Sequence, residues 1–182
     1  MFNDKRSKKI VVVAHCLLNQ NSISDGTADL PSQFNKIVNL LIENEIGIIQ
    51  LPCPELLCLG LARKDETGAN NELPYENTRI RTLMEKDENK ELLRSRAREI
   101  VKQLEDYIKY DFQILGILGV NRSPSCGIET TTIDCKETEG RGVFMQILED
   151  ELLKQGIKIT MVGTKTGEQE ESYTKVKNIF EK

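Results

Sequence analysis

Four short apolar runs, each followed by a segment with helical periodicity, constrain the fold of this 182-residue chain most strongly. The runs are rich in Ile and Val and nearly continuous, which is typical of parallel strands buried on both faces. They cover Ile10–Ala14, Ile46–Leu51, Gln113–Val120 and Ile157–Val162. The helical patterns cover Ser32–Asn44, Asn89–Tyr110, Gly142–Gln155 and Glu168–Glu181. This alternation predicts one α/β domain over residues 1–182, with a doubly wound, mostly parallel, four-stranded sheet of the Rossmann-like kind.

One long stretch without clear periodicity follows the second predicted strand. It runs from Pro52 to about Lys86. Irregular segments of this length inside a compact domain are usually functional. We therefore expect an active-site loop here, serving as a lid or pocket wall, with a short helix of its own.

Composition and charge indicate which partners this protein binds and in which compartment we expect it. The net charge of −4 and the pI of about 5.3 argue against nucleic acid as the main partner, because binding to phosphates depends on clustered Lys and Arg. The basic run at Lys5–Lys9 is expected to be a solvated terminus. No segment approaches the roughly 20 apolar residues that span a bilayer, and the first residues lack the apolar core of a signal peptide. We therefore expect no membrane association and a cytoplasmic location, where thiols stay reduced.

Three of the five cysteines stand just after predicted strands. Cys16 follows the first strand, Cys53 the second and Cys126 the third. Ligands of open α/β sheets bind beyond the carboxyl ends of the strands, and neighbouring strands lie only about 5 Å apart. The three thiols can therefore converge at one edge of the sheet. In a reducing compartment, cysteines beside Gly and Pro turns are more often metal ligands or catalytic groups than disulfide partners.

Three thiolates leave several chemistries open. A four-iron, four-sulfur (4Fe–4S) cluster usually takes four cysteines, so a set of three would leave one iron free to bind substrate. The scattering of the ligands over three strands favours this cluster over a three-thiolate zinc site. Packing of the thiols as small apolar groups is the third possibility. Cys58, in an apolar run, is expected to pack in the core, and Cys135, in a polar loop, is a weak candidate for a further ligand.

Two polar residues near these cysteines are candidates for catalysis. Glu55, two residues after Cys53, is the best candidate for a general base or proton shuttle; alternatively, it caps a turn or pairs with Arg63. Ser123 is the second candidate, and its alternative role is to cap the turn that leads to Cys126.

Three further residues are candidate substrate-binding groups. Ser125 directly precedes Cys126, and Asn121 follows the third predicted strand. Asp25 belongs to an Asp-Gly pair that either faces the pocket or forms a plain turn.

Two other segments have simpler interpretations. His15 is expected to be structural rather than a ligand, since neighbouring residues of an extended chain point in opposite directions. Gly140-Arg141-Gly142 could present backbone N–H groups to an anion, but a turn at the start of a helix is the safer interpretation.

Five short blocks around these residues occur together and in one order. They are His15-Cys16-Leu17-Leu18, Ser24-Asp25-Gly26, Pro52-Cys53-Pro54-Glu55, Gly60-Leu61-Ala62-Arg63 and Ser123-Pro124-Ser125-Cys126-Gly127. Over about residues 9–148, the chain resembles the thiouracil desulfurase family. The Cys-Pro-Glu and Ser-Pro-Ser-Cys-Gly blocks are fairly specific when they occur together.

The resemblance implies a non-redox desulfuration. In such an enzyme, a 4Fe–4S cluster held by Cys16, Cys53 and Cys126 binds the sulfur of a thiocarbonyl at its open iron, and water replaces the sulfur to leave a carbonyl. A thiophilic metal polarises the C=S bond, a carboxylate activates the water, and hydrogen-bond donors stabilise charge on the ring.

This chain departs from the family pattern at three places. Asn19 stands where glycine is usual, Ile23-Ser24 where a basic-aromatic pair is usual, and Gly119–Arg122 where a lysine-containing segment is expected. These positions are expected to line the pocket, so the departures predict a related branch with its own substrate.

The sequence therefore favours a cluster-dependent desulfurase of a small thiocarbonyl compound, such as a thiolated pyrimidine. The alternative is a non-catalytic iron–sulfur or zinc module that senses redox state or metal. A third hypothesis is a small-molecule-binding domain whose cysteines are merely packed.

Overall fold

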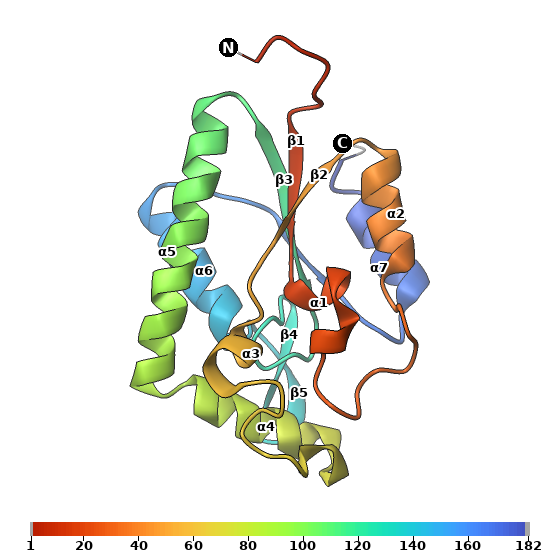
Figure 1. Cartoon of the computed structure of the whole chain (residues 1–182), viewed down its shortest axis with the longest axis vertical. Helices are drawn as coiled ribbons and strands as arrows, with labels where there is room; N and C mark the ends of the chain where they lie inside the picture. The colour runs from red at the N-terminus through yellow and green to blue at the C-terminus, as the bar shows by residue number, and fades with distance from the viewer. Residues whose placement is uncertain (1, 181–182) are drawn as a thin grey trace.

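A parallel sheet of four strands forms the centre of the computed structural model, which describes residues 2–180 (Figure 1). The strands are β1 (Lys9–Val13), β2 (Gly47–Gln50), β3 (Gln113–Val120) and β6 (Met161–Thr164). They lie in the order β2-β1-β3-β6, and every neighbouring pair is parallel. The predicted fold class is therefore confirmed.

Helices cover both faces of this sheet. α5 (Asp87–Lys109) and α6 (Val143–Lys154) lie together on one face, and α2 (Asn35–Glu43) and α7 (Gln169–Lys177) lie together on the other (Figure 1). The predicted helix over residues 168–181 thus ends at Lys177, and its last predicted residue lies outside the described residues.

The long helix α5 shows why the helices pack as they do. Its buried residues recur every three or four positions, which forms one apolar stripe along the helix. They include Leu93, Ala97, Ile100, Val101 and Leu104. This stripe packs against α6 and β3 and joins the main hydrophobic core.

The α5–α6 interface also contains a buried carboxylate, that of Glu151, which is only 6% exposed. It accepts hydrogen bonds from Lys154 at 2.6 Å and from Arg98 at 3.2 Å, and Arg94 lies 3.9 Å away. All three cations are partly exposed to solvent.

The fourth strand of the sheet begins four residues further along the chain than the sequence predicts. The ladder uses Met161–Thr164, whereas the prediction was 157–162. Ile157 and Ile159 still pack against the core, so the apolar run marks the approach to the sheet as well as the strand itself.

The stretch at 52–86 contains the short helix that was expected there, but the prediction that the rest is irregular is wrong. The segment contains α3 (Pro54–Leu59), the 3-10 turn η2 (Gly68–Asn70) and α4 (Leu73–Met84). Proline stands in the first turn of both α3 and α4, where its fixed φ suits a helix and no N–H is needed. The prolines therefore begin helices here instead of interrupting them.

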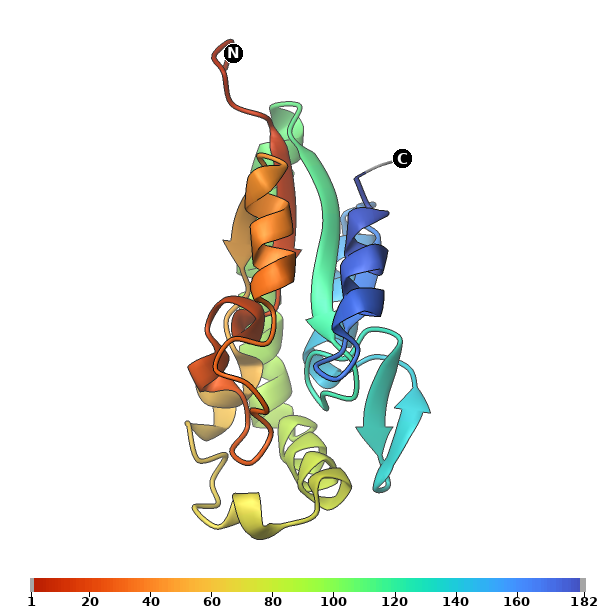
Figure 2. The same ribbon diagram turned by 90° about the vertical axis from the view of Figure 1, so that its right-hand side faces the viewer.

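A short antiparallel hairpin was not predicted. It consists of β4 (Thr130–Ile133) and β5 (Lys136–Glu139), and it projects beside the end of the main sheet (Figure 2). The turn residues Asp134 and Cys135 both have positive φ, as a two-residue hairpin turn of the primed type requires. Since β5 is fully exposed and polar, the sequence offers no apolar alternation to reveal it.

The topology fixes where a ligand can bind. From β1 the chain continues to β2 on one side of β1, while β3 lies on the other side. The crevice at such a switch point, beyond the carboxyl ends of the strands, is the usual ligand site of doubly wound sheets. α1 (His15–Leu18) and η1 (Gln20–Ser22) follow β1 directly at this edge.

Among residues 2–180, no helix has the length and apolar character to cross a membrane.

Candidate active site

A cavity of about 350 Å³ lies at the carboxyl edge of the sheet. Its walls come from the segment after β1, from α3, from the start of α4 and from the turn after β3. The lining residues include His15, Cys16, Ser22, Ser24, Cys53, Glu55, Arg63, Asn77, Asn121, Arg122, Ser123 and Cys126. Because residues 53–77 supply part of the wall, the expectation of a pocket wall in that stretch is confirmed.

The structure brings the three strand-end cysteines together at this cavity. Cys16 is the second residue of α1, whose N-cap residue, Ala14, donates its N–H group to the Leu118 carbonyl of β3 at 2.8 Å. Cys53 is the N-cap residue of α3, and its Sγ accepts a hydrogen bond from the Leu56 N–H group at 3.4 Å. Cys126 belongs to the turn after β3 and is almost fully buried. All three line the same cavity.

The turn that carries Cys126 folds back tightly onto β3. The Val120 N–H group donates to the Cys126 carbonyl at 2.9 Å, and the Cys126 N–H group donates to Ser123 Oγ at 3.0 Å. A Cβ atom on Gly119 would lie 2.3 Å from the Cys126 carbonyl oxygen. Only glycine therefore allows the thiol to be placed so close to the strand end.

Burial dominates the electrostatics of the three thiols. It raises the pKa of Cys16 to about 12, with Cys53 and Glu55 adding to the effect. Burial also raises the pKa of Cys53 and raises that of Cys126 well above the ordinary value. Thiols with such raised pKa values keep their protons at neutral pH, so a metal that binds them must displace those protons.

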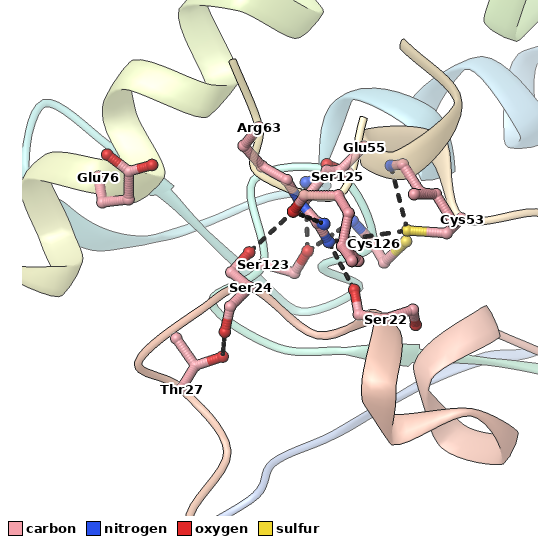
Figure 3. Close-up of polar contacts among 12 residues, drawn as sticks. Ser22, Ser24, Thr27, Cys53, Glu55, Arg63, Glu76, Ser123, Ser125 and Cys126 are labelled. Carbon is pink, nitrogen blue, oxygen red and sulfur yellow. Dashed lines mark hydrogen bonds and ion pairs between the residues drawn. The ribbon is translucent and has the colours of Figure 1, made fainter. Parts of the chain in front are cut away.

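Glu55 lies among these thiols as a buried carboxylate, 7% exposed. Its Oε1 accepts from the Ser125 hydroxyl at 2.6 Å, and its Oε2 accepts from the Ser24 hydroxyl at 3.1 Å. Oε2 also accepts from Arg63 Nε at 3.1 Å. Figure 3 shows these groups gathered around Glu55, with Cys53 beside them. The pairing with Arg63, which the sequence left as an alternative to catalysis, is thus present, and Glu55 still lines the cavity.

Arg63 is the more deeply buried member of this pair, at 3% exposure. Its Nη2 donates to the Ser22 carbonyl at 2.5 Å and lies 4.0 Å from Cys53 Sγ. Its backbone φ is +50°, and that of the next residue, Lys64, is +60°. Each left-handed residue other than glycine costs roughly 1 kcal/mol or more and persists only where its surroundings hold it.

Two other predicted site residues, Ser123 and Asn121, line the cavity. Ser123 lines the cavity, and its hydroxyl oxygen accepts backbone N–H groups from Ser125 and Cys126. Asn121 also lines the cavity, but its side chain is engaged by the Glu129 carboxylate and by three backbone N–H groups of residues 128–130.

Ser125 and Asp25 lie outside the cavity lining. Ser125 is fully buried behind Glu55, which it contacts through its hydroxyl group. Asp25 is exposed, and its carboxylate accepts the N–H group of Gly26 at 3.0 Å, which is the plain-turn arrangement. The adjacent Ser24 is the residue that reaches Glu55.

Sequence reasoning missed one lining residue, Asn77, whereas Arg122 belongs to the segment 119–122 that was expected to line the pocket and does line it. Asn77 of α4 is buried and donates to Thr132 Oγ1 at 3.3 Å. Arg122 adopts a φ of +68° just after β3. Recognising α4 as a helix would have placed Asn77 on its buried face, whereas no signal in the sequence fixes the conformation of Arg122.

Four other predicted positions can be placed. His15 lines the cavity, and its Nε2 lies 3.3 Å from the Asn19 amide nitrogen. Cys58 packs against the core, as expected, and Cys135 is exposed in the β4–β5 turn. Arg141 pairs with Glu149 and donates to a backbone carbonyl, so residues 140–142 form the turn before α6.

Among residues 2–180, no group of three or more His, Cys, Asp or Glu side chains is arranged to hold a metal ion.

A comparison with known proteins gives one relationship over nearly the whole chain. The uncharacterized protein MJ0003 of Methanocaldococcus jannaschii is 30% identical over 177 residues, which cover 97% of each chain. The chain belongs to the same family as this archaeal protein. Since the alignment covers nearly all of both chains, the family shares the entire α/β domain and not one motif. No model of a known protein family and no solved structure matches the chain.

Proposed function

We propose that this protein is a desulfurase that replaces the sulfur of a small thiocarbonyl compound, such as a thiolated pyrimidine, by oxygen from water. The observation that carries the proposal is the meeting of Cys16, Cys53 and Cys126 in one cavity that also contains the buried carboxylate of Glu55. The resemblance of the surrounding sequence blocks to the thiouracil desulfurases supports the same reaction. The net reaction consumes water and releases sulfide, without oxidation or reduction of the substrate.

The donor set fits a 4Fe–4S cluster with Cys16, Cys53 and Cys126 as its ligands. Thiolates bind different irons of such a cluster, so they need not converge on one point as the ligands of a single ion do. The three enter the cavity from three different strand ends, and no fourth cysteine among residues 2–180 lines it. When bound, the cluster would supply a thiophilic Lewis acid that polarises the C=S bond.

The chain's own residues would handle protons around the substrate. In this proposal, Glu55 takes a proton from the attacking water and returns it to the departing sulfide. Ser24, Ser125 and Arg63 fix the orientation of its carboxylate. The fixed orientation matters because general base catalysis requires the base within hydrogen-bond reach of the proton that it removes.

Ser123 is the proposed donor to the substrate. Its oxygen accepts two backbone N–H groups, and no described residue accepts its hydroxyl hydrogen. The hydroxyl can therefore donate toward negative charge that develops on the ring when water adds. The proposal also includes a reducing, cytoplasmic location, in which the thiols and the cluster stay intact.

One observation favours a second candidate, a non-catalytic iron–sulfur or zinc module. The ion pair with Arg63 accounts for the burial of Glu55 without any catalytic role. In that case the cysteines would bind metal and the cavity would not turn over substrate.

Anaerobic reconstitution with iron and sulfide separates the candidates. For the desulfurase, we expect about four irons per chain, broad absorption near ~400 nm and sulfide release from 2-thiouracil or 4-thiouracil in a single-turnover assay. The Cys58→Ser variant is the matched control, because Cys58 lies outside the cavity. A loaded protein that releases no sulfide from either compound would support the second candidate, and a protein that takes up no iron would contradict the cluster.

A further inference from the structure

The ion pair between Glu76 and Arg79 lies within α4, outside the lining of the cavity. Arg79 Nε donates to Glu76 Oε2 at 2.8 Å, and Arg79 Nη2 donates to Oε1 at 2.5 Å. The Asn71 amide donates to Oε2 at 3.0 Å. These hydrogen bonds, chiefly those from Arg79, hold the pKa of Glu76 below its ordinary value. At 6% exposure, Glu76 is a buried charge with a fixed set of partners.

Arg79 extends this arrangement toward the site. Its Nη2 also donates to the backbone carbonyl of Arg63 at 3.0 Å, and Asp65 lies 3.9 Å from its Nε. Arg63 and Lys64 are the two consecutive left-handed residues, with φ of +50° and +60°. A backbone conformation of this kind persists only where neighbouring groups hold it, and the Arg79 guanidinium is the side chain bonded to the Arg63 carbonyl.

The left-handed turn directs the Arg63 side chain back toward α3. There its Nε donates to Glu55 at 3.1 Å and its Nη2 lies 4.0 Å from Cys53 Sγ. A continuous series of contacts thus runs from Glu76 through Arg79 and Arg63 to Glu55. Figure 3 shows Glu76 on α4, set apart from the group around Glu55.

Glu76 also holds a second segment of the site. A Cβ atom on Gly68 would lie 2.7 Å from Glu76 Oε1, so η2 packs its backbone directly on this carboxylate. The next residue of η2, Ala69, lies beside Gly26, because a Cβ atom on Gly26 would lie 3.6 Å from the Cβ atom of Ala69. Gly26 belongs to the segment that carries Ser24, a hydroxyl donor to Glu55.

We propose that Glu76 and Arg79 are positioning residues, which fix Arg63 and the Ser24 segment and thereby hold the Glu55 carboxylate in its orientation for the reaction. The inference rests on the proposed function for its kinetic consequence, but the positioning itself can be measured without turnover. Neither residue touches the cavity, so neither is a catalytic residue.

Three variants test the inference. Glu76→Gln keeps the size of the side chain and removes its charge, and Arg79→Met removes the contact with the Arg63 carbonyl. Arg79→Lys keeps a positive charge beside Glu76 but loses the planar fork that contacts Glu76 and Arg63 together. It is the variant of choice should Arg79→Met fold poorly. Glu151→Gln is the matched control, since Glu151 is equally buried and also pairs with Arg and Lys, but on the α5–α6 side.

The direct measurement is hydrogen exchange at the Nε–H group of Arg63, observed by NMR and assigned by its loss in Arg63→Lys. We expect exchange to become at least ~10-fold faster in Glu76→Gln and in both Arg79 variants, and to stay unchanged in Glu151→Gln. Cluster-loaded enzyme should lose about 10- to 100-fold in kcat, with KM within about twofold, because a misplaced catalytic group weakens the reaction more than binding.

The possible outcomes separate the two proposals. Exchange and kcat equal to those of the Glu151→Gln control in all three variants would overturn the positioning role. Faster exchange in a protein whose wild type releases no sulfide would support the positioning role and contradict the desulfurase. A loss of kcat without faster exchange at Arg63 would also overturn the inference, because the defect would then arise elsewhere.

Discussion

Glu55 and Glu151 are two glutamates with nearly the same exposure, 7% and 6%, in two different regions of the molecule. Glu151, between α5 and α6, is neutralised by three cations whose side chains reach solvent. Glu55, at the carboxyl edge of the sheet, pairs with one cation among the described residues, the buried Arg63, and accepts from two hydroxyl donors.

The two glutamates differ in whether their cationic partners are exposed to solvent, and this difference indicates a different role for each ion pair. Partly exposed cations neutralise a carboxylate without being desolvated themselves, so the Glu151 cluster joins two helices without a buried cation. Burying both members of an ion pair is unfavourable unless the geometry is well defined, so the Glu55–Arg63 pair fixes orientation more than it stabilises the fold. Fixed orientation is what a proton-transfer group needs, and the predictions below test that contrast.

The largest expected effect concerns the thiols that surround Glu55. Cys16→Ser, Cys53→Ser and Cys126→Ser should each abolish assembly of the cluster, because each removes one of three ligands. Cys58→Ser and Cys135→Ser should leave it largely intact, because neither residue lines the cavity. Iron and sulfide analysis of the five variants measures this. Full iron content in any of the first three would end the assignment of that cysteine as a ligand.

The next effect concerns turnover. Glu55→Gln should keep the cluster and lower the single-turnover rate by about 100-fold, because glutamine preserves hydrogen bonding but cannot accept the proton. Glu151→Gln should leave the rate unchanged. Near-normal turnover of Glu55→Gln would remove this residue from the mechanism and make both glutamates structural.

A smaller effect concerns stability. Arg63→Met leaves the Glu55 carboxylate buried without its cation, which should lower the free energy of unfolding by about 3 kcal/mol. Arg98→Met should lower it by less than ~1 kcal/mol, because its partner Glu151 keeps other cations and Arg98 is largely exposed. Urea unfolding of the two variants measures the difference. Equal losses would show that the two glutamates are held in the same way.

The smallest expected effect concerns the free energy of unfolding at acidic pH. The hydrogen bond from Lys154 holds the pKa of Glu151 below its ordinary value of 4.5. The native state therefore binds fewer protons than the unfolded state, so this stabilisation is complete above about pH 4.5 and is lost as the pH falls through the lowered pKa. We expect Glu151→Gln to make stability less dependent on pH below 4.5. An unchanged pH profile of the unfolding free energy would contradict this.

The sequence predicts the sheet and its helices well, because the strands are short, nearly continuous runs rich in Ile and Val that alternate with segments of helical periodicity. It fails at α3 and α4, where prolines at helix starts resemble those of a loop, and at β5, which has no buried face. Parallel topology brings strand ends to one edge, which is why the positions of Cys16, Cys53 and Cys126 could be predicted.

The surroundings of Glu55 could not be predicted in the same way. Ser24 rather than Asp25 reaches the carboxylate, and Arg63 does so through a left-handed backbone that is not encoded by glycine. Such contacts depend on the conformations of single turns and on segments far apart in the chain. Periodicity carries no information about either.

The pairing of β1 with β3 has a consequence for how the domain forms. Cys16 and Cys126 are separated by 126 − 16 = 110 residues, and contacts between such distant positions form slowly because a long loop must close. During synthesis on the ribosome, the cavity cannot exist before residue 126 has emerged. A ligand that contacts both Cys16 and Cys126 can therefore bind only after the first two strands and the longest helix have been synthesised.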